Sequence, residues 1–427
     1  FSAVLDARTP QWRQIRLNTP VRWEIGDPLE ALTNRLLMLD AEVAPWIDGQ
    51  PKSDPDRRAI SGGGPARVAQ RSLADTDAAG PRPDAAEVAR STAEASPGSI
   101  VISAVDRSGL HRDDDQLGAI HGLLNSAHYQ TRPSDLRRLL DSPDLHLWVA
   151  TADTRIVGVL SVLAEGNLPG PLAEAVWRGV RRPSGHLLPQ VMALHGGGSA
   201  AAATGYLRVS RLAVHPQLQR QGIASRLINA LRVWGRRCGV DALGSSFGAT
   251  PALLAFWRAQ GMWPVHIGHQ RNATSGEYSV IVLDALAPTF ASRLAAWRER
   301  FLEDLPYRLG DSLRDLDERL AADLLRGSPA PTWRSSDAAE LTYYADGNRT
   351  YAAIQPNLRR VAAGLCAHAN IIGLDPMEQQ ALVARVLQAR SWAVCADRLN
   401  CAGQAGVERV LRAAIRKALP RKGLSLG

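Results

Sequence analysis

The stretch YLRVSRLAVHPQLQRQGIASRLINAL, residues 206–231, decides the fold that the sequence predicts. Its first half is rich in aliphatic and β-branched residues up to Val214, and Pro216 ends that run, which predicts a strand. In its second half, apolar residues recur at helical spacing from Ile223 onward, which predicts a helix. We therefore expect a strand, a short turn and a helix.

The turn itself has the composition of an anion-binding segment. Residues 219–224, Gln-Arg-Gln-Gly-Ile-Ala, fit the pattern Q/R-x-x-G-x-G/A. Small residues let backbone N–H groups approach an anion, the N-terminus of a helix adds partial positive charge, and Arg220 adds a charge-assisted contact. The pattern resembles the pyrophosphate-binding turn of the GNAT acetyltransferases. The alternative is an ordinary strand–helix turn that needs only a small residue.

Length and charge bound the possible partners. The 427 residues suggest two to four domains, and because the first residue is Phe1 rather than Met we expect a fragment or a processed product. The formal charge of +8 and the pI of about 9.7 favour a polyanionic partner. Arginine supplies nearly all of the positive charge, which suits bidentate phosphate contacts, although a GC-rich genome would also produce it.

The cysteines argue against a metal site. Cys238, Cys366, Cys395 and Cys401 form no C-x-x-C pair, so we expect neither a zinc knuckle nor a disulfide scaffold. A reducing cytoplasm is the expected compartment. Because the sequence has no run of eighteen apolar residues and no signal-peptide pattern, we expect no membrane association.

Composition divides the chain into four predicted parts. Residues 1–48 form a small piece with a helix capped by Asp27, and residues 49–97 form a disordered linker rich in Pro, Gly and Ala. Residues 98–287 alternate strands and helices, which predicts an α+β fold with a mixed central sheet flanked by helices. Residues 288–427 are predicted to be all helical, with single helices expected over 312–325 and 376–395.

The last predicted helix carries a run of cations, Arg409, Arg412, Arg416 and Lys417. Such a run is typical of a solvated helix face, but it also fits a surface that binds RNA phosphates. The sequence leaves both interpretations open.

Several stretches together resemble one family, the TmcA-type tRNA(Met) cytidine acetyltransferases. They are residues 19–23 (TPVRW), 26–30 (GDPLE), 124–141 (LNSAHYQTRPSDLRRLLD), 165–166 (EG), 175–190 (AVWRGVRRPSGHLLPQ), 211–216 (RLAVHP), 246–248 (SFG), 275–277 (SGE), 345–347 (ADG) and 388–392 (QARSW). The resemblance extends over nearly the whole chain except the predicted linker.

That resemblance implies an architecture and a set of partners. Members of the family have a RecD-like ATPase module, a GNAT domain and a helical tRNA-binding tail. The sequence contains no G-x-x-x-x-G-K-[ST] loop, and residues 1–48 resemble only the end of the ATPase module. We therefore expect no ATP site in this chain, apart from a possible contact by Arg22, and a separate ATPase half is a possible partner.

The resemblance also implies a reaction and site residues. The reaction moves acetyl from acetyl-CoA to N4 of a cytidine in RNA, as in the wobble cytidine of elongator tRNA(Met). The expected catalytic residues are His128 and Arg211, with a loop-pinning histidine and a strand-edge ion pair as the alternatives. The expected cofactor-binding residues are Leu212, Ala213, Val214, Gln219, Arg220, Gln221, Gly222, Ile223, Ala224 and Ser225.

Several further residues are weaker candidates for the site, and one predicted helix departs from the family's pattern. His186 and His195 are candidates for the RNA entrance, Glu165 for a base acting through water, and His215 for a structural role. On the helix predicted for residues 251–260, Ala252 and Ala259 stand where the family has an acidic residue and an arginine, and Arg258 is the expected substitute. Two other functions stay open: a GNAT enzyme acting on a protein or small amine, and a non-catalytic RNA-binding module.

Overall fold

The computed structural model describes residues 27–39, 41–43, 99–127 and 133–419, so the predicted linker and His128 lie outside the described residues. The chain divides into two compact units: Phe1–Leu163 with Arg211–Cys238, and Ala164–Ser210 with Gly239–Gly427. Within the described residues, no helix is long and apolar enough to cross a membrane.

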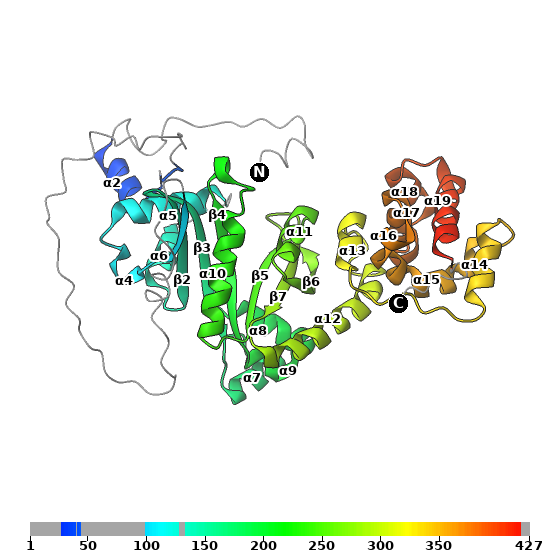
Figure 1. Ribbon diagram of the computed structural model, residues 1–427, viewed down its shortest axis with the longest axis horizontal. Helices are drawn as coiled ribbons and strands as arrows, with labels where there is room; N and C mark the ends of the chain where they lie inside the picture. Colours follow the sequence, from blue (N-terminus) through cyan, green and yellow to red (C-terminus); the bar gives the residue numbers. More distant parts are fainter. Residues whose placement is uncertain (1–26, 40, 44–98, 128–132, 420–427) are drawn as a thin grey trace. The chain divides into compact units, whose positions relative to one another are not determined.

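The strands form one mixed sheet of seven strands in the order β1-β2-β3-β4-β5-β7-β6 (Figure 1). Among the described pairings, β4 and β5 are parallel from Tyr206↔Ala242 to Val209↔Ser245, and the others are antiparallel. This confirms the predicted mixed sheet. Its strands are β1 (Ile100–Ala104), β2 (Leu145–Ala152), β3 (Arg155–Gly166), β4 (Gly205–Val214), β5 (Ala242–Gly248), β6 (Trp263–Arg271) and β7 (Tyr278–Ala285).

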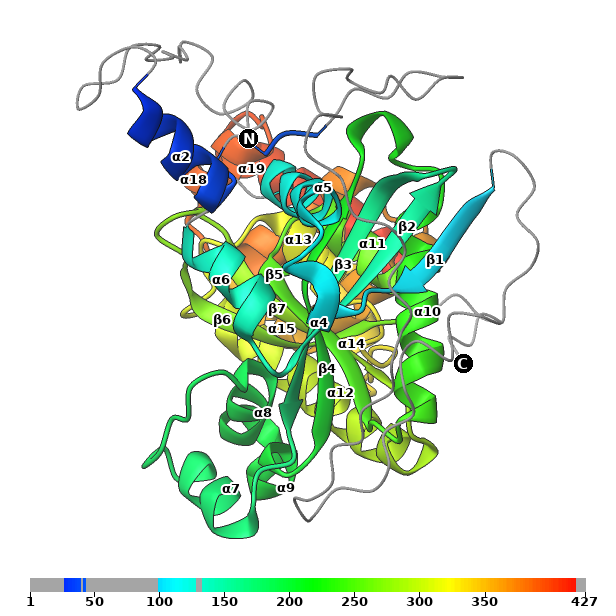
Figure 2. The ribbon, with the colours of Figure 1, turned by 90° about the vertical axis from the view of Figure 1, so that its left-hand side faces the viewer.

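In the first unit, alternate residues of β2 face two different helical layers (Figures 1 and 2). Leu145, Leu147 and Val149 pack against helices α5 (Asp114–Ser126) and α6 (Pro133–Asp141). On the opposite face, the Trp148 ring lies 5.0 Å from the Trp234 ring of α10 (Ile223–Arg237). The two-residue period of the strand therefore buries both faces and fixes α10 against the sheet. Two further helices of this unit are α2 (Pro28–Leu37), with the predicted cap at Asp27, and α4 (Arg107–Leu110).

In the second unit, an insertion between β3 and β4 folds into helices α7 (Gly170–Trp177), α8 (Leu187–Met192), η3 (Ala193–Gly197) and α9 (Gly198–Ala202). Gly166 opens it with φ +88°, and a Cβ there would lie 1.8 Å from the carbonyl oxygen of Thr204, so the position requires glycine. Side chains of the insertion share a core with Tyr206, Leu283 and Trp297. The insertion is thus an integral layer over this part of the sheet.

Helix α12 (Pro288–Leu309) connects the sheet of the second unit to the helical tail (Figure 1). Phe290 and Trp297 near its start enter the core formed with the insertion, and Leu305 and Leu309 are buried near its end. A helix of this length spans about 33 Å. The tail comprises α13 (Glu318–Leu324), α14 (Asp337–Ala345), α15 (Tyr351–Ala367), α16 (Ala369–Ile372), α17 (Pro376–Ala381), η5 (Leu382–Leu387), α18 (Trp392–Arg398) and α19 (Gly403–Ala418).

Two predicted tail helices are wrong in their extent. Helix α13 begins only at Glu318, because Asp317 caps a new helix there by accepting hydrogen bonds from the N–H groups of Arg319 and Leu320. The helix predicted over 376–395 ends at Leu387, and Ala389 adopts φ +50° before α18 begins. Helix α14 was not predicted at all.

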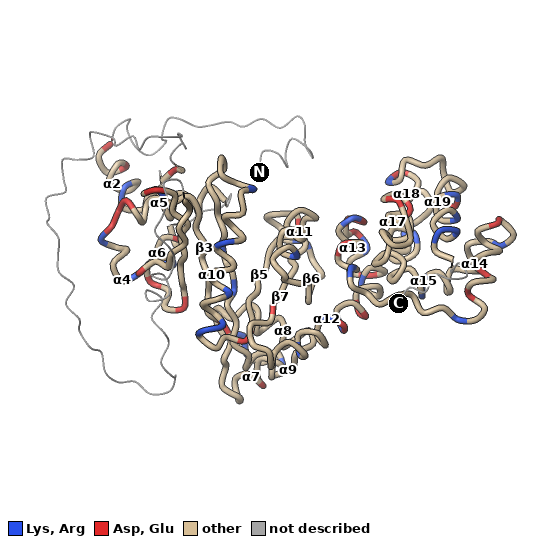
Figure 3. Tube along the Cα trace, viewed as in Figure 1, with Lys and Arg blue, Asp and Glu red and all other residues tan. Residues whose placement is uncertain are grey.

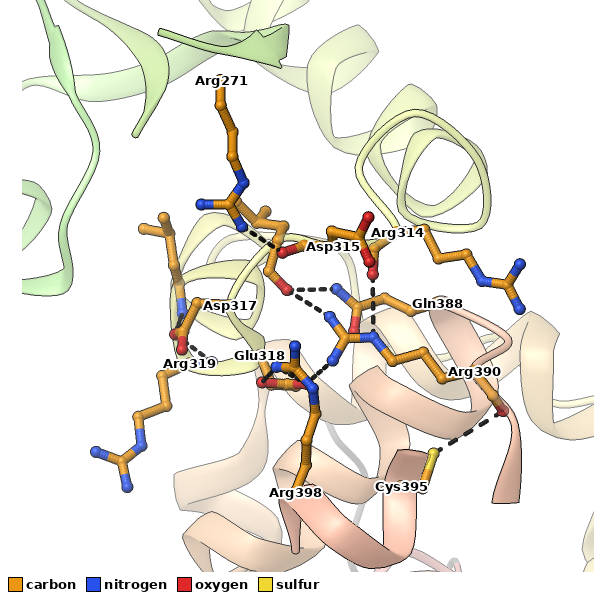
Figure 4. Close-up of polar contacts among 12 residues, drawn as sticks. Arg271, Arg314, Asp315, Asp317, Glu318, Arg319, Gln388, Arg390, Cys395 and Arg398 are labelled. Atoms are coloured by element: carbon orange, nitrogen blue, oxygen red, sulfur yellow. Dashed lines mark hydrogen bonds and ion pairs between the residues drawn. The ribbon is translucent and has the colours of Figure 1, made fainter. Parts of the chain in front are cut away.

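The break before α18 is held by a buried arginine (Figure 4). Arg390 donates to the carbonyl oxygens of Arg314 at 3.0 Å and Leu316 at 2.9 Å, and its guanidinium pairs with the carboxylate of Glu318. Gln388 donates to the same Leu316 oxygen at 2.8 Å. The segment 388–392, one of the stretches that carry the family resemblance, therefore ties the tail to the turns that precede α13.

Candidate functional site

The predicted strand–turn–helix forms as expected. After β4, the N–H of His215 donates to the Val157 carbonyl oxygen at 2.8 Å, and a 3-10 turn, η4 (Pro216–Leu218), follows. Arg220 at φ +64° and Gly222 at φ +81° then turn the chain into α10. Backbone geometry in which several N–H groups converge is suited to binding an anion.

The N-terminus of α10 is left open. Gly222 is its N-cap and supplies no side-chain hydrogen bond, and the first turn contains no acidic residue. A Cβ on Gly222 would meet no atom within 4 Å, so space remains in front of the helix. Because the first N–H groups of a helix have no partner within it, Ile223 and Ala224 present donors at its positive end.

The side chains around this turn divide into exposed and packed groups. Arg220 and Gln221 are exposed, whereas Ile223 is buried, with its Cγ2 atom 3.1 Å from where a Cβ on Gly158 would lie. Ala213 on β4 is likewise buried, within the core shared with α5 and α6. Ile223 and Ala213 therefore have only backbone groups to offer a ligand.

Arg211 lies in a buried polar group that the sequence did not reveal. Its guanidinium Nη2 pairs with the Asp135 carboxylate of α6 at 2.9 Å, and both side chains are largely buried. His121 of α5, which is 4% exposed, faces the same pair. Burial and the positive charge of Arg211 lower the pKa of His121 against the opposing effect of Asp135, so this imidazole is neutral near pH 7. A histidine at helical spacing among leucines gave no sign of this contact in the sequence.

His128 belongs to the segment between α5 and α6 that lies outside the described residues. Its predicted catalytic role therefore stays a prediction.

The weaker candidates near the insertion make structural contacts. One oxygen of the buried Glu165 carboxylate accepts from Arg208 at 2.6 Å, and the other accepts from the Leu188 N–H at 2.9 Å. The Nδ1 atom of His186 accepts from the N–H of Gly166 at 2.9 Å. These contacts join the start of the insertion to its middle and leave no Glu165 oxygen without a partner. His215 likewise accepts from the N–H of Gln217 at 3.3 Å, as a structural histidine would.

Arg258 of α11 (Pro251–Ala259) points to the tail. It donates to the carbonyl oxygen of Asp323, lies 3.6 Å from the Asp323 carboxylate, and covers the Trp263 ring at 5.9 Å. These contacts hold Arg258 against α13, which argues against the cofactor-binding role predicted for it.

Figure 3 marks Lys and Arg positions of α19 in blue. Three of the four predicted RNA-binding cations of this helix have partners inside the tail. Arg412 covers the Tyr344 ring at 5.1 Å and pairs with Glu408 at 3.3 Å. Arg416 donates to the Ala345 carbonyl oxygen, and Lys417 pairs with Glu378 at 2.7 Å. Arg409 is exposed, and no side-chain partner is described for it among residues 133–419. The cationic run therefore stabilises helix packing in large part.

A family model supports this reading of the strand–turn–helix. The model described as GNAT acetyltransferase 2 matches residues 119–238 and 235–287. This match confirms the GNAT fold predicted for this part of the chain. A second model, described as RNA cytidine acetyltransferase NAT10/TcmA, helicase domain, matches residues 1–40.

Curated relatives match far more of the chain than the GNAT domain alone. A tRNA(Met) cytidine acetyltransferase TmcA from Nitrosococcus halophilus is 38% identical over 97% of this chain. Relatives of the same name from Vibrio cholerae and Haloferax volcanii are 28% identical over 97% and 31% identical over 96%. The chain covers 50%, 51% and 49% of these three proteins, so it spans about half of their length. The predicted resemblance is confirmed.

Solved structures also match part of the chain. The ribosomal-protein-S18-alanine N-acetyltransferase from Escherichia coli is 14% identical, with a TM-score of 0.30, and the match covers 44% of this chain and 95% of that one. The assignment of the GNAT domain rests on the family model.

Proposed function

We propose that this chain transfers the acetyl group of acetyl-CoA to the exocyclic N4 amine of a cytidine in RNA. The observation that carries the proposal is the open turn at the N-terminus of α10, where Arg220 is exposed and Gly222 leaves free space within a GNAT domain. The similarity of almost the whole chain to tRNA(Met) cytidine acetyltransferases supports cytidine in tRNA as the acceptor.

The turn would hold the pyrophosphate of the cofactor. The N–H groups of Ile223 and Ala224 supply donors at the positive end of α10, and Arg220 supplies a full charge. Gln219, Gln221 and Ser225 complete the proposed phosphate-binding segment. The backbone of Leu212, Ala213 and Val214 would lie along the pantetheine and acetyl groups, and one of its N–H groups would stabilise the oxyanion.

The chemical step balances without a further reactant. The N4 nitrogen attacks the thioester carbonyl carbon, the C–S bond breaks, and the CoA thiolate leaves. N4 gives up one proton, and one proton reaches the thiolate. The N4 lone pair is conjugated with the pyrimidine ring, so N4 is a weak nucleophile. Catalysis therefore depends mainly on positioning the amine and removing its proton.

We assign the proton transfer to His128, whose ordinary imidazole pKa of about 6.5 suits a base at neutral pH. Arg211, held by Asp135 on α6, would orient the acceptor or offset charge that develops during transfer. Of the α19 cations, Arg409 is the best placed to contact tRNA, because Arg412, Arg416 and Lys417 already hold the tail together.

We further propose that the reaction takes place in the cytoplasm, where tRNA is modified, and that ATP dependence, as expected for the family, would need an ATPase half besides the residues present in this chain.

Mass spectrometry of nucleosides tests the proposal. The chain is incubated with a tRNA pool and isotopically labelled acetyl-CoA, with and without ATP, and the RNA is digested. The expected product is labelled N4-acetylcytidine, which disappears in the Gly222→Glu variant. Label that appears in protein or in small amines, and not in RNA, would instead support an ordinary GNAT enzyme. RNA binding with neither cofactor binding nor label would support a non-catalytic RNA-binding module.

A further inference from the structure

A group of basic side chains lies in the second unit, away from the strand–turn–helix in sequence. The imidazole rings of His195 and His266 lie 4.3 Å apart between centroids with an interplanar angle of 34°. His266 on β6 is 9% exposed, whereas His195 in η3 of the insertion and His269 near the end of β6 are exposed. Arg308 of α12 donates to the Ile267 carbonyl oxygen at 2.6 Å, which fixes its guanidinium beside β6.

The insertion holds His195 in place through an unusual backbone. His195 leaves the helical conformation at φ −112° and ψ 22°, and Gly196 follows at φ 146°. A Cβ on Gly197 would lie 2.7 Å from the Trp297 ring, so the segment is pressed against α12. Backbone outside the common regions persists where its surroundings fix it, which is frequent at ligand sites.

The charges that act on the two neighbouring rings all have one sign. Burial, together with the smaller effects of His195, Arg308 and His269, lowers the pKa of His266 to about 3. Burial, Arg308 and His269 lower the pKa of His195 in the same direction. Asp304 acts on Arg308 and also lies 3.7 Å from Arg300, but no carboxylate contributes to the pKa of either ring.

Most hydrogen-bond donors of the group have no described partner. The guanidinium of Arg308 has five N–H donors, and one hydrogen bond is described for it. Among residues 133–419, no hydrogen bond is described for the ring nitrogens of His195, His266 or His269. The positive charge of Arg308, ring donors without a described partner and the lack of a carboxylate acting on either ring among the described residues together suit an anion. A guanidinium favours the geometry of a phosphate.

We propose that His195, His266, His269 and Arg308 bind a phosphate group of the reaction's own ligands. The proposal rests on the proposed function, which supplies two sources, an RNA phosphodiester and the 3′-phosphate of CoA. The pyrophosphate of CoA already has a place at the turn before α10. The four side chains come from the insertion, β6 and α12, so this site forms only when those elements pack together.

Titration with inorganic phosphate tests the site directly, independently of acetyl transfer. In the full chain labelled at histidine ring carbons, signals are assigned by single His→Gln substitutions and followed by NMR across pH. Phosphate should raise the pKa of the His195 ring by about one unit, because an anion favours the protonated form. The rise should vanish in Arg308→Gln and persist in Arg319→Gln, whose exposed arginine on α13 is a matched control. No change with phosphate would overturn the proposal.

Two binding measurements identify the source. If RNA supplies the phosphate, Arg308→Gln should weaken tRNA binding about tenfold and reduce the salt slope by about one, while Arg319→Gln changes neither as strongly. If CoA supplies it, the variant should weaken CoA binding and leave the affinity for dephospho-CoA unchanged. Unaltered binding of both ligands would overturn the assignment to either source. Phosphate binding in a chain that shows no acetylation of RNA would retain this site and reject the proposed function.

Discussion

The turn before α10 and the helix α19 both look like phosphate-binding segments in the sequence, but the structure uses their cations differently. At the turn, Arg220 is exposed, and the helix end behind Gly222 has no capping side chain. In α19, Arg412 covers an aromatic ring of the tail, Arg416 donates to a backbone carbonyl oxygen, and Lys417 pairs with a carboxylate. We infer that the engaged groups stabilise the fold, and we propose that the open groups bind a ligand.

This difference separates two kinds of mutational effect. Replacing an engaged cation should cost stability with little change in ligand affinity. Replacing an open group should cost affinity with little change in stability. Substitutions of engaged and open groups should therefore differ in whether they lower stability or ligand affinity.

The largest effect is expected for Arg390→Ala. The side chain of Arg390 is 4% exposed, and its loss leaves the buried Glu318 carboxylate with Arg398 as its remaining described cationic partner. Breaking a buried ion pair costs about 3 kcal/mol in free energy of unfolding. Denaturant unfolding should show this loss, whereas calorimetry should show unchanged affinity for acetyl-CoA.

Arg398→Ala is the control for Arg390. Its side chain is 41% exposed, so it should cost about 1 kcal/mol or less. Equal losses for the two variants would contradict the account of the buried pair.

Gly222→Glu should give the next largest effect, an affinity for acetyl-CoA about 100-fold lower, or about 2.7 kcal/mol. A side chain at this position fills the space in front of α10, and its carboxylate repels the pyrophosphate. Isothermal titration calorimetry measures the change.

Gly239→Glu is the matched control for Gly222. Gly239 also has positive φ and open space, but it follows the C-terminus of α10. It should carry the same backbone strain and bind acetyl-CoA normally. Equal loss of affinity in both variants would mean that strain, not the anion site, explains the effect.

Lowering the pH should destabilise the protein because of His266. Its pKa of about 3 in the folded protein lies below the ordinary value of about 6.5, so the unfolded chain binds more protons between these values. Stability is therefore lost as pH falls below about 6.5, by about 2 kcal/mol between pH 7 and pH 5, and the dependence flattens near pH 3. His266→Gln should reduce the slope of unfolding free energy against pH, whereas His111→Gln, at an exposed histidine, should not.

The smallest effects are expected within α19. Arg412→Ala removes the contacts with Tyr344 and Glu408 and should cost about 1 kcal/mol of stability. Arg409→Ala should change stability by less than about 0.5 kcal/mol and weaken tRNA binding in a fluorescence anisotropy titration. If Arg409→Ala lowered stability and Arg412→Ala weakened only tRNA binding, the distinction between engaged and open cations would be wrong.

Local patterns predicted much of the fold. The strand ending before Pro216, the helix after Gly222 and the cap at Asp27 follow from local composition and capping preferences, and all three form. The helix predicted over 376–395 failed because a buried arginine, Arg390, stabilises a break that no local pattern encodes.

Local patterns likewise could not predict interactions between residues that are distant in sequence. The composition of residues 206–231 was sufficient to predict the strand, the turn and α10, whereas the anion site at that turn stays a prediction. The electrostatic effect of Arg211 on His121 and the proximity of the His195 and His266 rings involve residues that are distant in sequence, and only the packed fold brings them together. For the same reason, the sequence did not reveal that three cations of α19 would be engaged internally.

Hydrogen–deuterium exchange with and without acetyl-CoA tests the central claim most directly. With acetyl-CoA, peptides that cover residues 219–226 should exchange more slowly, because the ligand occupies the first N–H groups of α10. Exchange in residues 403–418 of α19 should not change. Unchanged exchange at 219–226 in the presence of bound acetyl-CoA would contradict that claim.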